Sequence, residues 1–420
     1  MSMSLGISDI AVYLPASAIE VSEIIEKRIA RDPQLEERLR KAAKFTGQQV
    51  IRFPQPWEDS ATMAAQASLR VLGRQNAIET NGFRYLTVGT ETTVDHSKPL
   101  SAYVQGMLKG VGLDTGTSIS TSQIQHACAG GMLSLLQVSS LLMAADNPSD
   151  RGIVICSDIA RYAQETSAEI TQGAGAAALL VEHSPKLLEL DIANIGQFSH
   201  DVDDFFRPLG QDVAQVRGAY SVQCYRTAFI KAFKDYCQRL DKDPQEIIAG
   251  TDFFALHTPF RSMPLLAMED LLSKLGGIEK SKCHSHLDER FFFDGIDAVA
   301  KVGNLYNASL FFVLAHMLKA AYAKCGEAIV GKKLVLGAYG SGATMLVLGA
   351  RISAAAPAVI KNWHMLDAGS YSMQSFDEYQ DWISKKGVYR DSHHAAPDVD
   401  SRLFFLKSVR KDGYRIYDCA

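Results

Sequence analysis

The segment QHACAGGM (125–132) carries the residue best suited to nucleophilic chemistry, Cys128. This cysteine precedes two glycines at the predicted start of a helix. Amide N–H groups at a helix N-terminus stabilise a thiolate and can donate to an oxyanion, and the glycines let the backbone come close to a thioester. From this segment alone, however, Cys128 could equally be a buried and inert thiol.

Three other residues strengthen the catalytic interpretation. Glu91 stands at the end of a predicted strand, after the apolar residues LTVG, which provide a setting that raises the basicity of a carboxylate. His257 stands at the end of another strand, and Asn304 just before a helix. A Cys nucleophile, a carboxylate base and a His/Asn pair that polarises a carbonyl make up a site for carbon–carbon bond formation on thioesters. Taken alone, His257 would more often be a hydrogen-bonded core residue.

The elements that would position these residues alternate between strand and helix. Short β-branched runs at 85–92 and 152–160 are typical of buried strands, and the helix expected between them at 130–145 is apolar nearly all round. The pattern restarts later in the chain, with a helix at 223–240, a strand at 252–260, a helix at 308–326 and a strand–turn–strand at 332–352. We therefore predict an α/β protein with two similar halves packed as layers.

The predicted halves divide near residue 180. Residues 1–180 would form the N-terminal half with Glu91 and Cys128, and residues 181–420 the C-terminal half with His257 and Asn304. The stretch near 355–402 is richer in polar residues, and we expect it to be a loop-rich appendage of the second half.

Several segments along the chain resemble the hydroxymethylglutaryl-CoA synthase family within the thiolase-like superfamily. They occur in the family's order and span nearly the whole chain, so together they are much more specific than any one of them. The segments are VGTETTVDHSK (88–98), ACAGG (127–131), SDIARYA (157–163), TQGAGAAALL (171–180), DFFRP (204–208), VRGAYSVQCY (216–225), HTPF (257–260), GNLYNASL (303–310), YGSG (339–342) and FFLKSVRKDGYRIY (404–417).

The resemblance implies a fold and a set of roles. The fold would be thiolase-like, with two similar βαβαβ-type halves in a five-layered α-β-α-β-α arrangement. Glu91 would be the general base, Cys128 the acyl acceptor, and His257 with Asn304 the pair that polarises the acceptor carbonyl. The residues implied or suggested for substrate binding are Tyr162, Thr171, Ser221, Gly340, Ser341, Arg261 and Arg52.

The activity implied is an aldol-like addition of a Cys-bound acetyl group to the ketone of a β-ketoacyl (acetoacetyl) thioester, followed by hydrolysis. Such an enzyme serves the mevalonate pathway or polyketide β-branching. Its partners would be acetyl and β-ketoacyl thioesters on CoA or on an acyl carrier protein, with no further cofactor. Members of the superfamily generally pair through the sheet of the N-terminal half, so we expect a homodimer.

Two departures from the family leave the carrier open. Ala129 follows the cysteine where the family usually has tyrosine, as in the simpler ketoacyl-acyl carrier protein synthases. Ser262 stands where a lysine that helps hold CoA is common, although Arg261 is adjacent. Arg52 lies in a stretch that also resembles those synthases and is a candidate contact for CoA, but it could form a surface ion pair instead.

Two other functions fit part of the same residue set. A ketoacyl-acyl carrier protein synthase III-like enzyme would catalyse a Claisen condensation with Cys, His and Asn and would need no glutamate base, so Glu91 discriminates against it. A catalytically inactive, scaffold-like member would only bind acyl carriers. The intact set of Cys128, Glu91, His257 and Asn304 argues against that alternative.

Composition excludes several partners. The chain has 420 residues, 47% of them hydrophobic, and a net charge of −4, without the basic stripe that binds phosphate backbones, so we expect no nucleic acid partner. The longest uncharged apolar run, 334–350, is too short and too interrupted by glycine for a membrane span. The first residues lack a basic region followed by an apolar run, and we expect no secretory signal.

Cysteine and histidine usage points the same way. The seven cysteines are scattered and form no CxxC pair, which favours free thiols in a reducing cytoplasm. The histidines in HSH (284–286) and HH (393–394) lack cysteine or carboxylate partners at metal-ligand spacing. We expect them to be solvated loop residues, and we predict no metal site.

Overall fold

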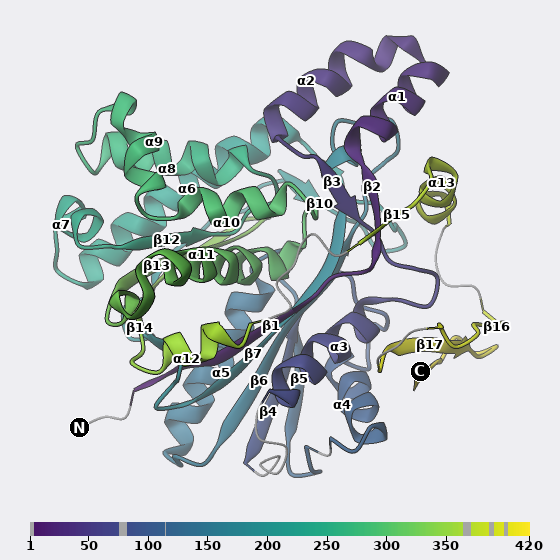
Figure 1. The fold of residues 1–420 in the computed structure, drawn as a ribbon, viewed down its shortest axis with the longest axis horizontal. Helices are drawn as coiled ribbons and strands as arrows, with labels where there is room; N and C mark the ends of the chain where they lie inside the picture. The colour runs from purple at the N-terminus through teal and green to yellow at the C-terminus, as the bar shows by residue number, and fades with distance from the viewer. Residues whose placement is uncertain (1–3, 75–81, 114, 364–370, 386–389, 399–401) are drawn as a thin grey trace.

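The computed structural model describes residues 4–74, 82–113, 115–363, 371–385, 390–398 and 402–420. Ten of the described strands form one large sheet, with β9 paired to β14 beside the main path (Figure 1). In spatial order the strands are β12 (Phe253–Leu256), β13 (Lys333–Gly340), β14 (Thr344–Ile352), β8 (Leu188–Leu190), β1 (Leu5–Tyr13), β7 (Gly173–His183), β6 (Arg151–Ala160), β4 (Phe83–Gly89) and β5 (Ser120–Ile124), with β9 at Gly196–Ser199.

The sheet has two parts that the short strand β8 connects. On one side, β4 runs parallel to β5 and β6, and β7 runs antiparallel to both β6 and β1. On the other side, β12 runs parallel to β13, and β13 antiparallel to β14. Strand β8 pairs with both β1 and β14, so the hydrogen bonding is continuous between the parts. The division of the chain near residue 180 stays a prediction.

Helices separate and cover the two parts of the sheet. Helix α5 (Gly130–Ala145) packs on β4, β6 and β7, while α11 (Ser309–Cys325) packs on β12 and β13. On the outer faces, α3 (Ser60–Gly73) and α4 (Leu100–Gly110) cover one part, and α6 (Gly218–Arg239) covers the other, with α8 (Ser262–Lys274) packed against α6. Figure 1 shows α3 and α5 on opposite sides of β1, β7 and β6. The predicted α-β-α-β-α succession and the α/β fold class are confirmed.

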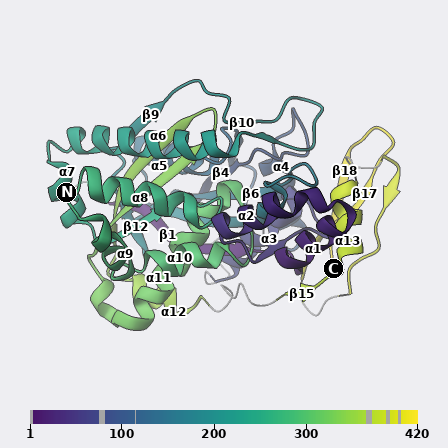
Figure 2. The same cartoon turned by 90° about the horizontal axis from the view of Figure 1, so that it is seen from above.

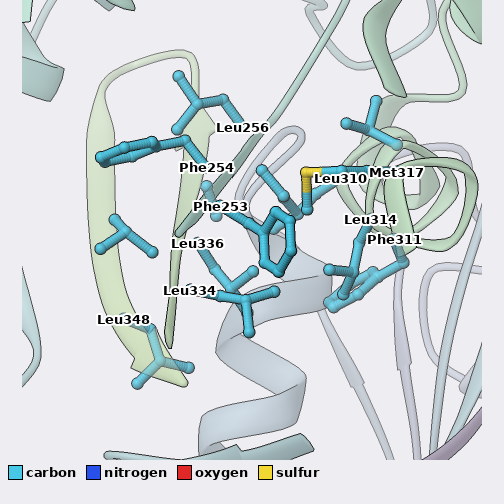
Figure 3. Packing of buried hydrophobic residues seen from close by; sticks show 14 of the residues in the cluster. Phe253, Phe254, Leu256, Leu310, Phe311, Leu314, Met317, Leu334, Leu336 and Leu348 are labelled. Carbon is cyan, nitrogen blue, oxygen red and sulfur yellow. The ribbon is translucent and has the colours of Figure 1, made fainter. Parts of the chain in front are cut away.

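Side-chain periodicity explains how the central layer holds together. Figure 3 shows Phe253 of β12 and Leu334 and Leu336 of β13 turned toward Leu314 and Met317 of α11. The strand residues alternate faces, whereas the helix residues recur with helical spacing, so each element presents one continuous apolar surface. All five side chains are buried. Burial of a side chain of this size stabilises the fold by about 1.5–3 kcal/mol, before the loss of conformational entropy is counted.

Helix α5 is apolar nearly all round, as the sequence predicts. Within the described residues, the segment Ala127–Ala145 is the one helical stretch that has the length and composition to cross a membrane. Half of it is buried inside the protein, which is how a core helix behaves.

The remaining elements lie mainly at the two ends of the molecule. Figure 2 shows α1, α2, α13, β17 and β18 gathered at one end and α7, α9 and α12 toward the other. Their bounds are α1 (Val21–Arg31), α2 (Glu36–Thr46), α7 (Pro244–Ala249), α9 (Lys280–Asp288), α10 (Phe292–Val299), α12 (Ala356–Lys361), α13 (Phe376–Ser384), β2 (Ser17–Glu20), β3 (Val50–Arg52), β10 (Phe205–Phe206), β11 (Gln215–Val216), β15 (Ser372–Met373), β16 (Ser392–His393), β17 (Phe404–Val409) and β18 (Arg415–Cys419), with 3₁₀ turns at Pro33–Leu35, Glu169–Thr171, Tyr306–Ala308 and Gly326–Ile329.

Helix α13 lies inside the stretch that we expected to be loop-rich. It begins with a capping box in which the side chains of Ser375 and Glu378 bond each other's backbone N–H groups. Phe376, Tyr379 and Trp382 bury one face of the helix against α1 and β3. The signal for this helix was therefore present in the sequence as SFDE. Residues 364–370, 386–389 and 399–401 of the same stretch lie outside the described part of the chain.

Two histidine segments also differ from expectation. His284 and His286 lie on α9 rather than in a loop, and His284 pairs with Glu269 at 2.9 Å. His393 belongs to the short strand β16, which pairs with β17. Helix α9 offered no strong capping signal in the sequence, since no side chain caps its N-terminus.

Candidate active site

Glu91 and Cys128 lie against each other. The Cys128 thiol donates a hydrogen bond of 3.4 Å to Oε1 of Glu91. A close approach of β4 and α5 brings the two residues together, because a Cβ on Gly89 would lie only 2.4 Å from the backbone N of Gly131. Glycine is therefore required where the strand end meets the helix start. Glu91 follows Gly89 by two residues, and Cys128 stands two residues before α5.

The backbone before Cys128 also has a special conformation. Ala127 has a φ of 40°, in the left-handed region that non-glycine residues rarely adopt. Such a conformation is held only where its surroundings impose it, and it is common at functional sites. Here it forms the tight turn that carries Cys128 into α5.

Asp158, at the end of β6, fixes the Glu91 loop. Its Oδ1 accepts hydrogen bonds from the Thr90 hydroxyl at 2.9 Å, the Glu91 N–H at 2.9 Å and the Thr92 hydroxyl at 2.7 Å. Its Oδ2 accepts from the side-chain amide of Asn307 at 2.8 Å and from the Asn307 N–H at 3.2 Å. This carboxylate is completely buried, and both of its oxygens accept hydrogen bonds.

Asn307 extends the network to the nucleophile. Its Oδ1 accepts the N–H of Gly131 at 2.8 Å, in the first turn of α5. The segment just before α11 is thereby tied to the helix that follows Cys128. We did not single out Asp158 or Asn307 from the sequence. Both residues lie in segments quoted for the family resemblance, SDIARYA and GNLYNASL, but nothing in the sequence indicated their contacts.

Burial gives Glu91 the properties of a base. Burial and the nearby charge of Asp158 raise its pKa to about 8, against the opposing effects of Arg207 and the Cys128 thiol. The Arg207 guanidinium donates to the Glu91 carbonyl and lies 3.9 Å from Oε2. A carboxylate of pKa near 8 accepts a proton much more readily than an ordinary one. Arg207 lies in the segment DFFRP, but its contact with Glu91 could not be predicted.

Cys128 is a thiol in the resting protein. Burial, Glu91 and Asp158 raise its pKa well above the usual value near 9. The helix N-terminus that we expected to favour a thiolate is outweighed, since both nearby carboxylates oppose a second negative charge. The thiol must therefore lose its proton as it attacks the thioester, and its hydrogen bond to Glu91 holds it beside the base of the later condensation step.

His257 is a neutral imidazole. It is 1% exposed, and burial lowers its pKa to about 3. Its backbone N–H donates a hydrogen bond to the Gly337 carbonyl, and its backbone carbonyl accepts one from the Tyr225 hydroxyl. Both bonds are 2.7 Å long. Within the described residues, Nδ1 has no hydrogen-bond partner. A buried polar atom of this kind is free to bond a ligand.

Asn304 and Tyr162 are joined directly. The side-chain amide of Asn304 donates to the Tyr162 hydroxyl at 3.3 Å, and its N–H donates to the Thr171 carbonyl at 3.0 Å. Thr171 thus acts through its backbone, while its hydroxyl bonds the Ala168 carbonyl.

Apolar groups enclose the nucleophile. Cys128 packs against the small cluster of Ala160, Tyr162, Ala214 and Tyr306. Phe205 meets the rings of Tyr162 and Tyr306 edge to face. These aromatic walls suit a short acyl chain and keep water from the carboxylate beside the thiol.

The glycine-rich turn after β13 adjoins Cys128. A Cβ on Gly340 would lie 2.5 Å from the His126 carbonyl, so the turn and the nucleophile segment touch. Buried Asp204 holds this turn by accepting from the Gly342 N–H at 3.1 Å and the Tyr339 hydroxyl at 2.8 Å. Ser221 donates to the same carboxylate at 3.0 Å. Ser221 therefore supports the turn, and Ser341 is part of it.

The two predicted arginines lie elsewhere. Arg52 is 1% exposed, and its guanidinium donates to the Pro15 and Ala16 carbonyls and stacks on the Tyr371 ring at 4.5 Å. Burial lowers its pKa to about 10. A structural role accounts for these contacts, and the side chain is not at the surface, where the alternative of a surface ion pair would place it. The predicted contact of Arg52 with CoA gains no support.

Arg261, by contrast, stays near the surface. It forms an ion pair with Asp297 and lies over the Phe293 ring at 5.4 Å. Its side chain is 36% exposed, so it remains accessible to a ligand. Its role in binding a carrier stays a prediction.

Two further findings concern metal binding and a groove away from this cluster. Within the described residues, no group of three or more His, Cys, Asp or Glu side chains could hold a metal ion. A groove of about 440 Å³ opens between α6 and α8, and none of the predicted site residues lines it; its walls are Gln223, Arg226, Thr227, Ile230, Lys231, Lys234, Asp270 and Lys274.

The raised pKa of Glu91 predicts a pH-dependent cost to stability. Between its usual pKa near 4.5 and the folded value of about 8, the unfolded chain loses this proton while the folded protein keeps it. Stability is therefore lost as the pH rises through this window. Glu91→Gln should raise the free energy of unfolding, by on the order of 2 kcal/mol more at pH 8 than at pH 5.

Urea unfolding at the two pH values measures this difference. The matched control is Glu37→Gln, which changes an exposed glutamate on α2. Equal effects of Glu91→Gln at pH 5 and pH 8 would contradict the assigned environment of Glu91.

Comparisons with known proteins find relatives over most of the chain. The family model described as hydroxymethylglutaryl-coenzyme A synthase N terminal matches residues 1–186. The hydroxymethylglutaryl-CoA synthase of Haloferax volcanii is 28% identical over 377 residues, which cover 81% of this chain and 82% of the relative. The polyketide biosynthesis 3-hydroxy-3-methylglutaryl-ACP synthase PksG of Bacillus subtilis is 24% identical over 356 residues, covering 81% of this chain and 78% of the relative.

Solved structures show the same relationship. MvaS in complex with 3-hydroxy-3-methylglutaryl coenzyme A superposes with a TM-score of 0.85 at 28% identity, over 100% of this chain and 99% of that one. The curacin biosynthetic pathway HMG synthase in complex with acetyl donor-ACP shares the fold, with a TM-score of 0.84 at 21% identity over 99% of this chain and 100% of that one. Residues 1–186 thus match the N-terminal model of the hydroxymethylglutaryl-CoA synthase family, and the chain as a whole is similar in sequence and fold to hydroxymethylglutaryl-CoA synthases.

Proposed function

We propose that the protein is a condensing enzyme that adds a Cys128-bound acetyl group to the ketone of an acetoacetyl thioester and then hydrolyses the acyl-enzyme. The observation that carries this proposal is the hydrogen bond between the Cys128 thiol and Glu91, a buried carboxylate with a pKa of about 8. A nucleophile and a strong carboxylate base are thus in reach of the same small acyl group. Relatives named as a hydroxymethylglutaryl-CoA synthase and as a polyketide biosynthesis 3-hydroxy-3-methylglutaryl-ACP synthase support the same type of reaction.

The first step is acyl transfer. Cys128 loses its proton and attacks the carbonyl of the acetyl thioester, and the carrier leaves as a free thiol that takes up a proton. We assign the oxyanion donors to the start of α5 and to the turn that contains Gly340 and Ser341, since the two segments touch. The aromatic cluster around Tyr162 would enclose the acetyl group.

The second step forms the carbon–carbon bond. Glu91 removes a proton from the acetyl methyl group, and the resulting carbanion attacks the ketone carbon of the acetoacetyl thioester. The ketone oxygen becomes an alkoxide, takes up a proton and remains as a hydroxyl. His257 and Asn304 polarise this oxygen by hydrogen bonds, because an imidazole with a pKa of about 3 acts as a neutral donor.

Water then completes the cycle. It adds to the thioester that joins the product to Cys128 and releases a carboxylate, while the sulfur recovers its proton. One acetyl thioester, one acetoacetyl thioester and one water give one 3-hydroxy-3-methylglutaryl thioester and one free carrier thiol. The reaction as proposed needs no cofactor beyond the thioester carriers.

The carrier is CoA or the phosphopantetheine arm of an acyl carrier protein. Among the similar structures, one is a complex with 3-hydroxy-3-methylglutaryl coenzyme A and another a complex with acetyl donor-ACP. We propose that Arg261, exposed at the start of α8, meets the carrier. We also propose a cytoplasmic location, which the seven free cysteines support and cell fractionation would test.

We further propose a homodimer built on the edge of the sheet. Strand β5 ends the order of the described strands, and its residues are exposed or half-buried. Helix α5 packs beside it and exposes Leu141 and Met143, at 38% and 52%. An unprotected edge strand next to apolar side chains favours pairing with a second copy.

The nucleophile assignment makes a direct prediction. Cys128→Ser should abolish formation of the acyl-enzyme, because an alkoxide forms far less readily than a thiolate at neutral pH. Incubation with acetyl-CoA or an acetyl carrier protein, followed by intact mass measurement, should show one added acetyl group on the wild type alone. Addition of acetoacetyl thioester should then discharge it and release the 3-hydroxy-3-methylglutaryl product. Acetylation that survives in Cys128→Ser would refute the assignment.

The dimer is tested by light scattering. We expect a mass of twice 45.9 kDa for the wild type at micromolar concentration. A charge on the proposed contact surface, as in Leu141→Glu, should shift the equilibrium toward monomer. A wild-type protein that stays at the monomer mass would contradict the proposal.

A further inference from the structure

A completely buried ion pair joins the first helix to a loop of the active site. Arg28 of α1 and Glu169 are both fully inaccessible, with Nη2 and Oε1 2.6 Å apart and Nε 3.2 Å from both carboxylate oxygens. Replacing such a pair by apolar residues is often neutral or even stabilising, so stability alone does not account for two buried charges. Their partners indicate what they hold in place.

Glu169 also accepts hydrogen bonds from two other segments of the chain. Its Oε2 accepts the Glu165 N–H at 2.6 Å, which closes the loop that follows Tyr162. Its Oε1 accepts the hydroxyl of Tyr379 at 2.9 Å, from α13 near the far end of the chain. Burial raises the pKa of Tyr379 well above its usual value, so this hydroxyl keeps its proton and donates it.

The Tyr379 hydroxyl fixes the orientation of one amide. Because its only proton goes to Glu169, the oxygen can accept, and it accepts Nε2 of Gln172 at 2.8 Å. The other end of that amide, Oε1, accepts the backbone N–H of Tyr162 at 2.8 Å. An inverted amide would lose both bonds, so the tyrosine determines that Gln172 holds Tyr162.

Residues 171–173 also fix the position of Asn304. The Thr171 carbonyl accepts the Asn304 N–H at 3.0 Å. A Cβ on Gly303 would lie only 1.7 Å from the Gln172 carbonyl, and one on Gly173 only 2.8 Å from the Asn304 nitrogen. The two backbones are therefore in direct contact, and a shift of residues 171–173 must move Asn304.

We propose that Tyr379, supported by the Arg28–Glu169 pair, is a positioning residue that orients Tyr162 and Asn304 for the acceptor thioester through Gln172. The inference rests on the proposed function for the identity of that acceptor. It assigns α1 and α13 a part in catalysis, although no residue of either helix belongs to the cluster around Cys128. Acetyl transfer to Cys128 uses the oxyanion donors assigned to the start of α5 and to the turn with Gly340. The relay bonds only the backbone N–H of Tyr162, whose ring stays packed in its apolar cluster, so acetyl transfer should be largely independent of the relay.

The central test is Tyr379→Phe, which removes one hydroxyl and keeps the ring in its packing against Phe53 and Trp382. Acetylation of Cys128 should stay within about twofold of wild type, while kcat/KM for acetoacetyl thioester falls about tenfold. Gln172→Met should give the same split. The double variant should be no slower than the slower single variant, because both changes interrupt one path.

The matched control is Tyr417→Phe. Tyr417 is also a tyrosine whose hydroxyl donates to a carboxylate at 2.9 Å, that of Asp59, but it lies on β18 and has no bond to the relay. It should leave both half-reactions unchanged. A Tyr379→Phe enzyme that condenses like wild type, or that loses both half-reactions equally, would overturn the proposal.

Hydrogen exchange separates this inference from the proposed reaction. The amides of Tyr162 and Asn304 should lose protection in Tyr379→Phe and keep it in Tyr417→Phe, whichever acceptor the enzyme uses. Unchanged protection of both amides would refute the positioning role by itself. Absence of condensation in the wild type, with protection lost as expected, would instead count against the proposed function alone.

Discussion

The site depends on one buried carboxylate, that of Asp158. A buried anion is costly unless hydrogen bonds compensate it, and Asp158 accepts five of them from Thr90, Glu91, Thr92 and Asn307. These donors come from the loop after β4 and from the turn before α11. Satisfying one charge therefore fixes two distant segments relative to the end of β6. The same charge helps to raise the pKa of Glu91 to about 8.

Close backbone approach completes what Asp158 begins. Gly89 lets β4 touch the first turn of α5, Gly340 lets the turn after β13 touch the segment of Cys128, and Gly303 lets the Asn304 segment touch Gln172. Each contact brings together parts of the chain that belong to different layers. Because a Cβ would collide with backbone atoms at each position, these glycines set the dimensions of the site.

The sequence predicted the fold and the chemical groups better than their connections. The alternation of strands and helices and the apolar character of α5 predicted the layers, and the resemblance identified Glu91, Cys128, His257 and Asn304. Asp158, Asn307 and Arg207 were missed because their importance lies in contacts across long sequence separations. For the same reason, the sequence offered Arg52 as a contact for CoA or a surface ion pair and did not reveal that its guanidinium is buried among backbone carbonyls.

Local sequence also misled where tertiary contacts decide. The start of α5 suggested a thiolate, but burial and two neighbouring carboxylates raise the pKa of Cys128. The polar stretch near 355–402 suggested loops, yet the capping box of Ser375 and Glu378 starts α13, and Tyr379 on that helix enters the relay to Gln172. For Cys128 the deciding groups are far away in the sequence, whereas the signal that starts α13 was local and was overlooked.

The most direct test of the account is proton removal by Glu91 from a bound acetyl group. Acetylated wild type and acetylated Glu91→Ala would be held in deuterated solvent and then examined by mass for deuterium in the acetyl group. The account predicts normal acetylation of both, deuterium uptake in the wild type only, and condensation slower by about 10²–10⁴-fold in the variant. A folded Glu91→Ala enzyme that condenses at a near-normal rate would contradict the account and favour a Claisen-type synthase.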